Sequence, residues 1–168
     1  LKLAETVDII VDNHKLGQLE AWGLSYETLS HSNEQIILTS ITPFGTWGPY
    51  SDFKATDLTL YHMTGHAHSL LGPVEDPNSD PPIRAGGHQT EFVAGLTAAT
   101  VSLMALYRRR MGGTGCHIIV SSFDAMATQA IAGLAACAFG RPTPSRDLNV
   151  KHEAAIGGVV SAVGGVLP

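Results

Sequence analysis

The residue best placed for covalent chemistry is Glu91, which follows the glycine pair Gly86 and Gly87 and opens a long, Ala-rich apolar segment. That segment predicts a helix, and the helix dipole favours the ionised form of a carboxylate in the first turn. The two glycines allow the backbone or a ligand to approach the carboxylate closely. The same pattern is also typical of a glutamate that only caps a helix. These residues alone therefore leave two interpretations open, a nucleophilic carboxylate and a capping one.

A second group of reactive side chains is formed by His62, His66 and His68. His62 and His66 are four residues apart and would share one face of a helix. However, Gly65 interrupts that helix, and no Glu follows His62 as a zinc-peptidase motif requires. We therefore expect no metal site. The sequence also lacks the phosphate-binding glycine loop, the dinucleotide-binding glycine fingerprint and the serine nucleophile elbow.

Alternating strands and helices are expected to position these residues. Segments rich in β-branched residues predict strands at 7–11, 35–41 and 117–121. Helical spacing and capping residues predict helices at 26–32, 56–71, 91–110 and 123–139. Strands separated by helices favour βαβ units and a mainly parallel sheet, so the predicted fold class is α/β.

Composition limits the kinds of partner. The 168 residues, 44% hydrophobic and 15% charged, suit one globular domain, and the net charge of −5 gives no support for binding to nucleic acid or to an anionic membrane. We see no apolar run of the roughly 18 residues that a membrane span needs. Cys116 and Cys137 are too few for a disulfide framework, which favours a cytoplasmic location. The arginines at 108–110 most simply balance the negative end of a helix dipole, with phosphate binding as the alternative.

The order of several motifs resembles the family III CoA-transferases, the CaiB–BaiF group. Residues 7–17 are similar to the family's strand and Asn-Phe/Tyr-x-Pro-Gly turn, and residues 40–50 to its Ser-Ile-Ser-Gly-Phe-Gly-x-x-Gly-Pro loop. Residues 91–115 resemble its catalytic carboxylate, Ala-rich helix and Arg-x-x-Gly-x-Gly turn. Together with similar segments at 19–29 and 57–65, the resemblance extends over about residues 5–140.

This resemblance implies a fold and an assembly. The chain would be a fragment of a doubly wound, mainly parallel, Rossmann-like large domain. Residues 1–150 would form the central part of that CoA-binding domain, and residues 151–168 would lead toward a small domain that this chain lacks. Because the chain opens on Leu1 and stops at Pro168 in an apolar stretch, we expect it to be a piece of a larger protein. Family members pair as interlocked homodimers and use CoA and acyl-CoA as substrates, with no permanently bound cofactor.

The resemblance also implies roles for individual residues. Glu91 falls where the family usually has a catalytic Asp, which forms covalent intermediates as CoA moves between carboxylic acids. Backbone N–H groups at the helix start and in the preceding glycine turn would then stabilise the oxyanion. Asn13 matches a CoA-binding Asn, and Lys54 matches a basic residue that meets the CoA phosphates. The alternatives are a turn residue at Asn13 and a solvated surface lysine at Lys54.

Several positions depart from the family pattern. An Arg found in some members is Ala21 here, the aromatic residue after Asn13 is His14, and the turn Pro is Leu16. The related α-methylacyl-CoA racemases use a His where this chain has Thr56, and a threonine cannot act as that base near neutral pH. Racemisation therefore remains an alternative only if another histidine, His62 or His88, replaces it. A non-catalytic CoA-binding subunit is the other alternative.

Overall fold

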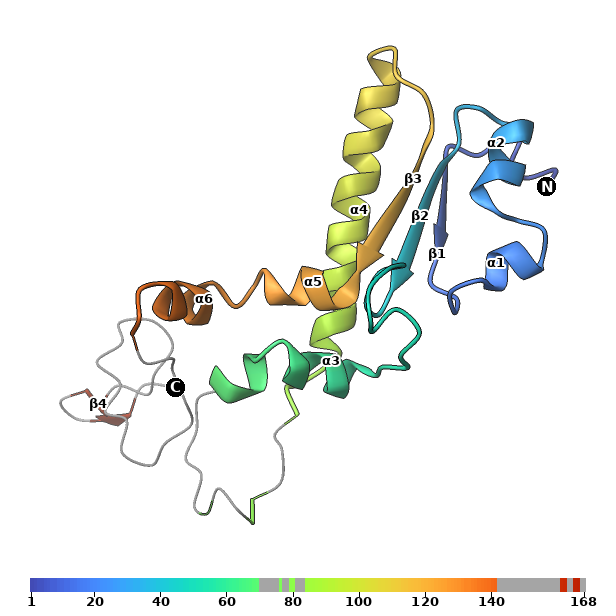
Figure 1. Ribbon diagram of the computed structural model, residues 1–168. Coiled ribbons are helices and arrows are strands. Elements are labelled where there is room, and N and C mark those ends of the chain that lie inside the picture. Colours follow the sequence, from blue (N-terminus) through green and yellow to red (C-terminus); the bar gives the residue numbers. More distant parts are fainter. Residues whose placement is uncertain (70–75, 77–78, 81–83, 142–160, 163–164, 167–168) are drawn as a thin grey trace.

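A three-stranded parallel sheet organises the molecule. The computed structural model describes residues 1–69, 76, 79–80, 84–141, 161–162 and 165–166 (Figure 1). Its sheet has the order β1-β2-β3, formed by β1 (Ile9–Asp12), β2 (Ile37–Thr42) and β3 (Cys116–Ser121). Both neighbouring pairs are parallel, with Ile9 opposite Ile37 and Ile37 opposite Cys116. The expected α/β class and parallel sheet are confirmed, with each strand within two residues of its predicted bounds.

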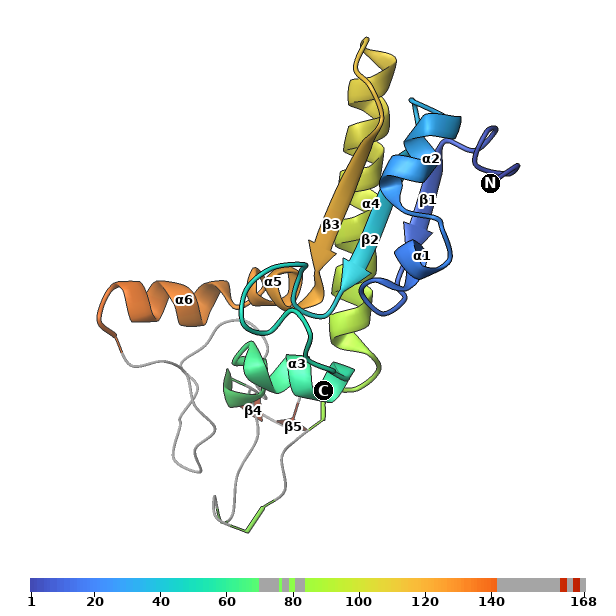
Figure 2. The same cartoon turned by 45° about the vertical axis from the view of Figure 1, so that its right-hand side comes forward.

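Helices cover the sheet and extend beyond one end of it. The short helices α1 (Gln18–Ala21) and α2 (Tyr26–Ser32) lie on one side, and the long helix α4 (Gln89–Arg110) lies on the other (Figure 2). Beyond the carboxyl ends of the strands lie α3 (Asp57–Met63), the 3₁₀ helix η1 (His66–Ser69), α5 (Ser122–Ala127) and α6 (Ile131–Ala138) (Figure 1). A separate antiparallel pair is formed by β4 (Ser161–Ala162) and β5 (Gly165–Val166).

The central strand β2 carries the core. On the α1–α2 side, Leu38 of β2 and Ile36, just before the strand, are buried in one cluster with Leu29. On the α4 side, the hydroxyl of Thr39 lies 2.7 Å from that of Ser102. The two buried hydroxyls therefore hydrogen-bond to each other, as buried polar groups require. The buried face of α4 is made only of small residues, Thr90, Ala94, Ala98, Ser102 and Ala105. Their size allows the helix backbone to lie close to the sheet.

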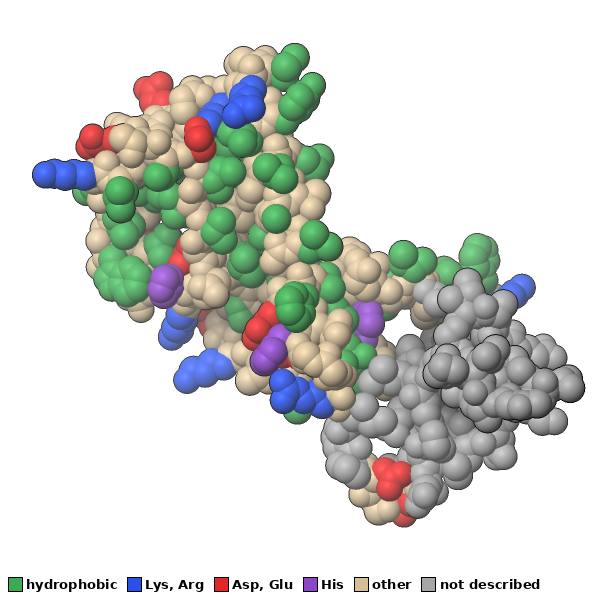
Figure 3. All heavy atoms as spheres, turned by 180° about the vertical axis from the view of Figure 1, so that it is seen from behind, with side chains coloured by type: hydrophobic (Ala, Val, Ile, Leu, Met, Phe, Trp, Pro, Cys, Tyr) green, Lys and Arg blue, Asp and Glu red, His purple; other side chains and the backbone are tan. Residues whose placement is uncertain are grey.

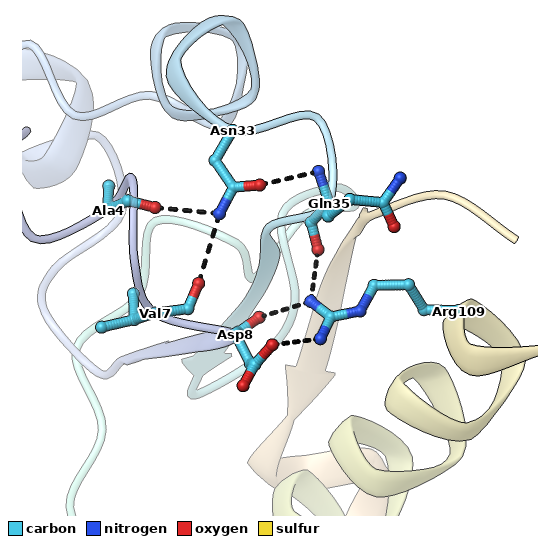
Figure 4. A network of polar contacts seen from close by, with 6 residues as sticks. All are labelled: Ala4, Val7, Asp8, Asn33, Gln35 and Arg109. Carbon is cyan, nitrogen blue, oxygen red and sulfur yellow. Dashed lines mark hydrogen bonds and ion pairs between the residues drawn. The ribbon is translucent and has the colours of Figure 1, made fainter.

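The amino ends of β1 and β2 are fastened to the last turn of α4. The guanidinium of Arg109 pairs with the carboxylate of Asp8 and donates to the carbonyl of Gln35 at 2.7 Å (Figure 4). The amide of Asn33 donates to the carbonyls of Ala4 and Val7 and accepts the N–H of Gln35 (Figure 4). Arg109 therefore acts here as a structural tether between helix and sheet.

One glycine is required by close backbone approach. A Cβ at Gly115 would lie 2.2 Å from the carbonyl oxygen of Ile36. The N–H of Gly115 donates to the carbonyl of Glu34 at 3.1 Å, which brings the start of β3 against β2. A larger residue at this turn would force the two strands apart.

The helix predicted at 56–71 is shorter than expected. Its α-helical part ends at Met63, and Gly65 has a φ of +81°, a left-handed conformation that breaks an α-helix. The chain then continues as η1. Residues 70 and 71 of the prediction, and the expected domain boundary at 150–151, lie outside the described residues.

The prediction of a single four-turn helix at 123–139 was wrong, because the chain forms the two helices α5 and α6 there. The hydroxyl of Thr128 donates to the carbonyl of Ala125 at 2.7 Å, and side chains that bond the backbone in this way compete with helical hydrogen bonds. α5 contributes Ala125 and Met126 to the core, whereas α6 exposes Ile131 and Leu134. The apolar residues of this segment therefore belong to the core in α5 and to the exposed surface in α6.

α4 has a buried face and an exposed apolar face. Phe92, Leu96, Leu103 and Tyr107 are all more than 60% exposed, and hydrophobic side chains are spread over the body of the molecule seen from behind (Figure 3). Among the described residues, α4 is also the one helix long and apolar enough to cross a membrane, although the sequence predicted no such segment. Core helices of soluble proteins pass the same test of length and composition.

Candidate active site

A cavity of about 390 Å³ opens at the carboxyl ends of the strands, where parallel α/β sheets bind their ligands. β1 leads directly into Asn13, which lines it, and β2 contributes Thr42. The starts of α3 and α4 contribute Asp57 and Glu91, and the start of α5 contributes Ser122. Two of the three predicted site residues, Asn13 and Glu91, therefore share one cavity although they are far apart in the sequence.

The turn that carries Asn13 is shaped by its neighbours. The carboxylate of Asp12 accepts the backbone N–H of His14 at 3.1 Å and lies 2.6 Å from Nδ1 of its ring. That ring meets the edge of Trp22, with 5.0 Å between ring centroids. Gly17, with a φ of +82°, then starts α1. These contacts hold the backbone of the turn and leave the exposed side chain of Asn13 at the cavity.

Glu91 lies in the first turn of α4 with its side chain 68% exposed. Its Oε2 is 3.4 Å from Nδ1 of His88, one helical turn earlier. Both residues line a second cavity of about 450 Å³, together with Arg84, Thr56 and Asp57. Because Glu91 lines both cavities, its carboxylate is open to a ligand from either side, with a histidine and an arginine close to it.

Asp57 connects α3 to the first turn of α4. Its Oδ1 accepts the backbone N–H of Thr90 at 2.8 Å and that of Glu91 at 3.4 Å. The side chain of His88 gives α4 no cap, so Asp57 provides this cap from another element. The helix-start N–H groups of Thr90 and Glu91, which the sequence suggested as oxyanion donors, are therefore occupied.

Asp57 was not among the residues predicted for the site. Thr56 caps α3 through a reciprocal pair with Thr59, and this local signal places Asp57 in a first helical turn. Its partners Thr90 and Glu91 are more than 30 residues away, and no local pattern reveals such a contact.

Lys54 is exposed on the loop before α3 and lines neither cavity. It precedes Ala55, which lines both. The structure thus brings Asn13 and Glu91 together but leaves Lys54 outside, at the approach to the site.

The racemase alternative has little support in this geometry. The hydroxyl of Thr56, at the racemase His position, lies 2.7 Å from that of Thr59 in the capping pair. His62 lines neither cavity, and Nδ1 of His88 lies only 3.4 Å from the carboxylate of Glu91. Two bases that exchange an α-proton must lie on opposite faces of the substrate's α-carbon. His88 and Glu91 are in contact with each other and do not lie in that way.

His66, another member of the histidine cluster found in the sequence, is part of the packing around η1. Its Nδ1 lies 3.2 Å from the hydroxyl of Thr64, and its ring packs against Tyr61. Burial lowers the pKa of His66 below that of a free imidazole. Within the part of the chain that the structure describes, no group of three or more His, Cys, Asp or Glu side chains is placed to hold a metal ion.

Comparison with known proteins identifies the family of this chain. The family model described as CoA-transferase family III matches residues 1–165. The chain belongs to CoA-transferase family III. A solved CaiB/BaiF family protein from Brucella suis superposes on 98% of the chain with a TM-score of 0.80 and 31% identity, and the chain covers 42% of that structure.

Curated relatives from this family carry transferase names. The chain is 34% identical over 125 residues to the succinyl-CoA:(R)-benzylsuccinate CoA-transferase subunit BbsE of Thauera aromatica, which matches 74% of the chain. It is 32% identical over 123 residues to the succinate–glutarate CoA-transferase of Agrobacterium fabrum, which matches 73% of the chain. The chain spans only 29% and 30% of the length of these two relatives. The candidate site described above therefore lies in a segment that corresponds to less than a third of such a protein.

Proposed function

We propose that the full-length protein transfers CoA from an acyl-CoA thioester to a carboxylic acid, with Glu91 as the covalent nucleophile. The observation that carries the proposal is the exposed carboxylate of Glu91 in the cavity that Asn13 also lines. Family membership supports the reaction class. A carboxylate suits this reaction because it can act both as nucleophile and as acyl carrier.

The proposed reaction balances in four steps. The Glu91 carboxylate attacks the thioester carbonyl, which forms a mixed anhydride and releases CoA thiolate. The thiolate attacks the Glu91 carbonyl, which gives a glutamyl-CoA thioester and frees the donor acid. The acceptor carboxylate then attacks this thioester, forms a second anhydride and again releases the thiolate. Attack of the thiolate on the acceptor carbonyl yields the new acyl-CoA and regenerates Glu91.

Neighbouring residues have supporting roles in this proposal. Asn13 would contact CoA inside the cavity, and Lys54 would meet its phosphates at the approach. With the N–H groups of Thr90 and Glu91 occupied, oxyanion stabilisation is assigned to the turn before α4, where Gly87 has a φ of +74°.

The donor and acceptor are proposed to be small organic acids. The names of the two relatives above contain succinyl-CoA or succinate, so succinyl-CoA is the first donor to test. Arg84 and His88 line the cavity beside Glu91 and would favour an acid with a second carboxylate.

The test of this proposal is covalent trapping. The full-length protein is incubated with a panel of acyl-CoA thioesters, its intact mass is measured, and any adduct is mapped by peptide. A CoA or acyl adduct on Glu91 would support the transferase and name the donor. Clear CoA binding without an adduct would instead favour a non-catalytic subunit, and exchange of the α-proton in heavy water without an adduct would favour a racemase.

We further propose that the protein is cytoplasmic and works as an interlocked homodimer. The exposed apolar faces of α4 and α6 support an assembly, because surfaces of this kind are normally covered by protein. Sedimentation of the full-length protein checks this, and a monomer at working concentration would contradict it.

A further inference from the structure

We propose that Asp57 is a positioning residue for the nucleophile: it holds the first turn of α4 and thereby sets where the Glu91 carboxylate lies. The inference rests on the proposed role of Glu91. It adds a residue from a different helix, with a function that is distinct from nucleophilic attack.

Three contacts join Asp57 to this turn. Its Oδ1 accepts the N–H of Thr90 and the N–H of Glu91, at 2.8 and 3.4 Å. Its backbone carbonyl accepts the hydroxyl of Thr90 at 3.4 Å. The side chain of Thr90 is fully buried, so this junction between α3 and α4 is packed as well as hydrogen-bonded.

The turn needs such an anchor for its geometry. α4 follows the glycine pair Gly86 and Gly87, which restricts the backbone little, and His88 makes no side-chain cap. The Glu91 side chain itself is 68% exposed, and within the described part of the chain His88 is its one polar contact. Its position is therefore set mainly through its backbone, and that backbone is bonded to Asp57.

Asp57 lines both cavities, so it is also the carboxylate that competes with Glu91 for the nucleophilic role. Its Oδ1 is already occupied by two N–H groups of α4, which fix the carboxylate in place, whereas the Glu91 carboxylate is exposed. The geometry therefore assigns attack to Glu91 and positioning to Asp57.

The experiment compares Asp57→Asn with Asp57→Ala in the full-length protein. An asparagine keeps an Oδ1 acceptor for the two N–H groups, whereas an alanine removes it. Asp52→Ala is the matched control, because it removes an exposed carboxylate from the loop before α3 that lines neither cavity. The rate of covalent adduct formation in a single turnover, the dissociation constant for CoA, and the hydrogen exchange of the Thr90 and Glu91 amides are measured for each variant.

We expect Asp57→Ala to slow adduct formation by about 10- to 100-fold, the order of loss caused by a misplacement of roughly 1 Å. CoA binding should change by less than about threefold, and both amides should lose exchange protection. Asp57→Asn should stay within about fivefold of the wild-type rate, and Asp52→Ala should match the wild type.

The inference would be overturned by a wild-type rate of adduct formation in Asp57→Ala, by an Asp57→Asn variant as slow as Asp57→Ala, or by unchanged protection of the two amides in Asp57→Ala. An adduct mapped to Asp57 would overturn it as well, and would make Asp57 the nucleophile. A wild-type protein that forms no adduct contradicts the proposed function instead, and the amide exchange still decides whether Asp57 holds the turn.

Discussion

The two ends of α4 are both fastened to other elements, but by different groups. At the amino end, the carboxylate of Asp57 accepts backbone N–H groups of Thr90 and Glu91. At the carboxyl end, the side chain of Arg109 bonds to Asp8 and to the carbonyl of Gln35. The first end is held by its backbone and the second by a side chain.

This difference explains why chemistry is proposed at only one end. Backbone anchoring leaves the Glu91 side chain free, and that side chain is 68% exposed. At the other end the Arg109 side chain is used as the anchor and is only 12% exposed. A helix end that is held through its main chain can present a reactive side chain in a fixed place. Where a side chain is itself the anchor, as Arg109 is, the contact stabilises the fold but leaves that side chain unavailable for chemistry.

The largest expected effect is at the amino end. Glu91→Gln should lower transferase turnover by on the order of a thousandfold or more, because a neutral amide cannot form the anhydride. CoA binding should be retained. Steady-state kinetics and calorimetry on the full-length protein measure the two effects. Glu27→Gln changes an exposed glutamate in the first turn of α2 and should leave both unchanged; wild-type turnover in Glu91→Gln would show that the nucleophile is elsewhere.

At the carboxyl end, Arg109→Ala should lower the free energy of unfolding by about 2 kcal/mol, because it removes charge-assisted hydrogen bonds to Asp8 and Gln35. Turnover per folded molecule should not change. Urea unfolding and active-site titration measure these quantities. The neighbouring exposed Arg110→Ala serves as the control, and an Arg109 variant as stable as that control would show that the tether contributes nothing.

A smaller effect is expected from Asn13→Ala. Loss of one hydrogen bond to CoA should raise the KM for acyl-CoA by about tenfold and leave kcat within about twofold. Lys54→Ala should raise the same KM by only about two- to threefold, since Lys54 lies outside both cavities. Initial-rate kinetics with one donor compare the two variants. A larger effect at Lys54 than at Asn13 would contradict the placement of CoA proposed here.

The smallest effect concerns the sheet between the two ends of α4. His117 stacks on Tyr26 and lies 2.9 Å from the hydroxyl of Ser40. Burial lowers the pKa of His117, although the nearby carboxylates of Glu20 and Asp12 act in the opposite direction. The unfolded chain therefore binds this proton more readily, and stability should fall slightly as the pH drops below about 6.5. Urea midpoints at two pH values test this, and His117→Gln should remove part of the slope; an identical slope in that variant would exclude His117 as its source.

Local patterns were enough for much of the fold. The β-branched segments predicted the three strands of the parallel sheet, although not the short pair β4 and β5. Ser25 caps α2 through the N–H of Thr28, as a serine before a helix should. Glu91 was expected in the first turn of a long helix and is found there. These features depend on residues that are neighbours in the sequence, so the sequence displays them directly.

Features that depend on distant residues could not be predicted. The bond from Asp57 to the start of α4 joins positions 33 residues apart, and the pairing of Arg109 with Asp8 joins positions 101 residues apart. The break between α5 and α6 was missed for a different reason, because the apolar spacing continues across it while Thr128 bonds the backbone. The sequence was therefore enough to propose Glu91 as the nucleophile, whereas the role of Asp57 became visible only in the structure.

The most direct test of the central claim follows one oxygen atom. In the proposed reaction an oxygen of the acceptor carboxylate bridges the second anhydride and remains on Glu91 when the thiolate takes the acyl group. The full-length protein is therefore turned over with an acceptor acid labelled with heavy oxygen in its carboxyl group, and its peptides are analysed by mass. The account predicts label in the side chain of Glu91 and none in Asp57. Turnover without label in Glu91, or with label in Asp57, would contradict it.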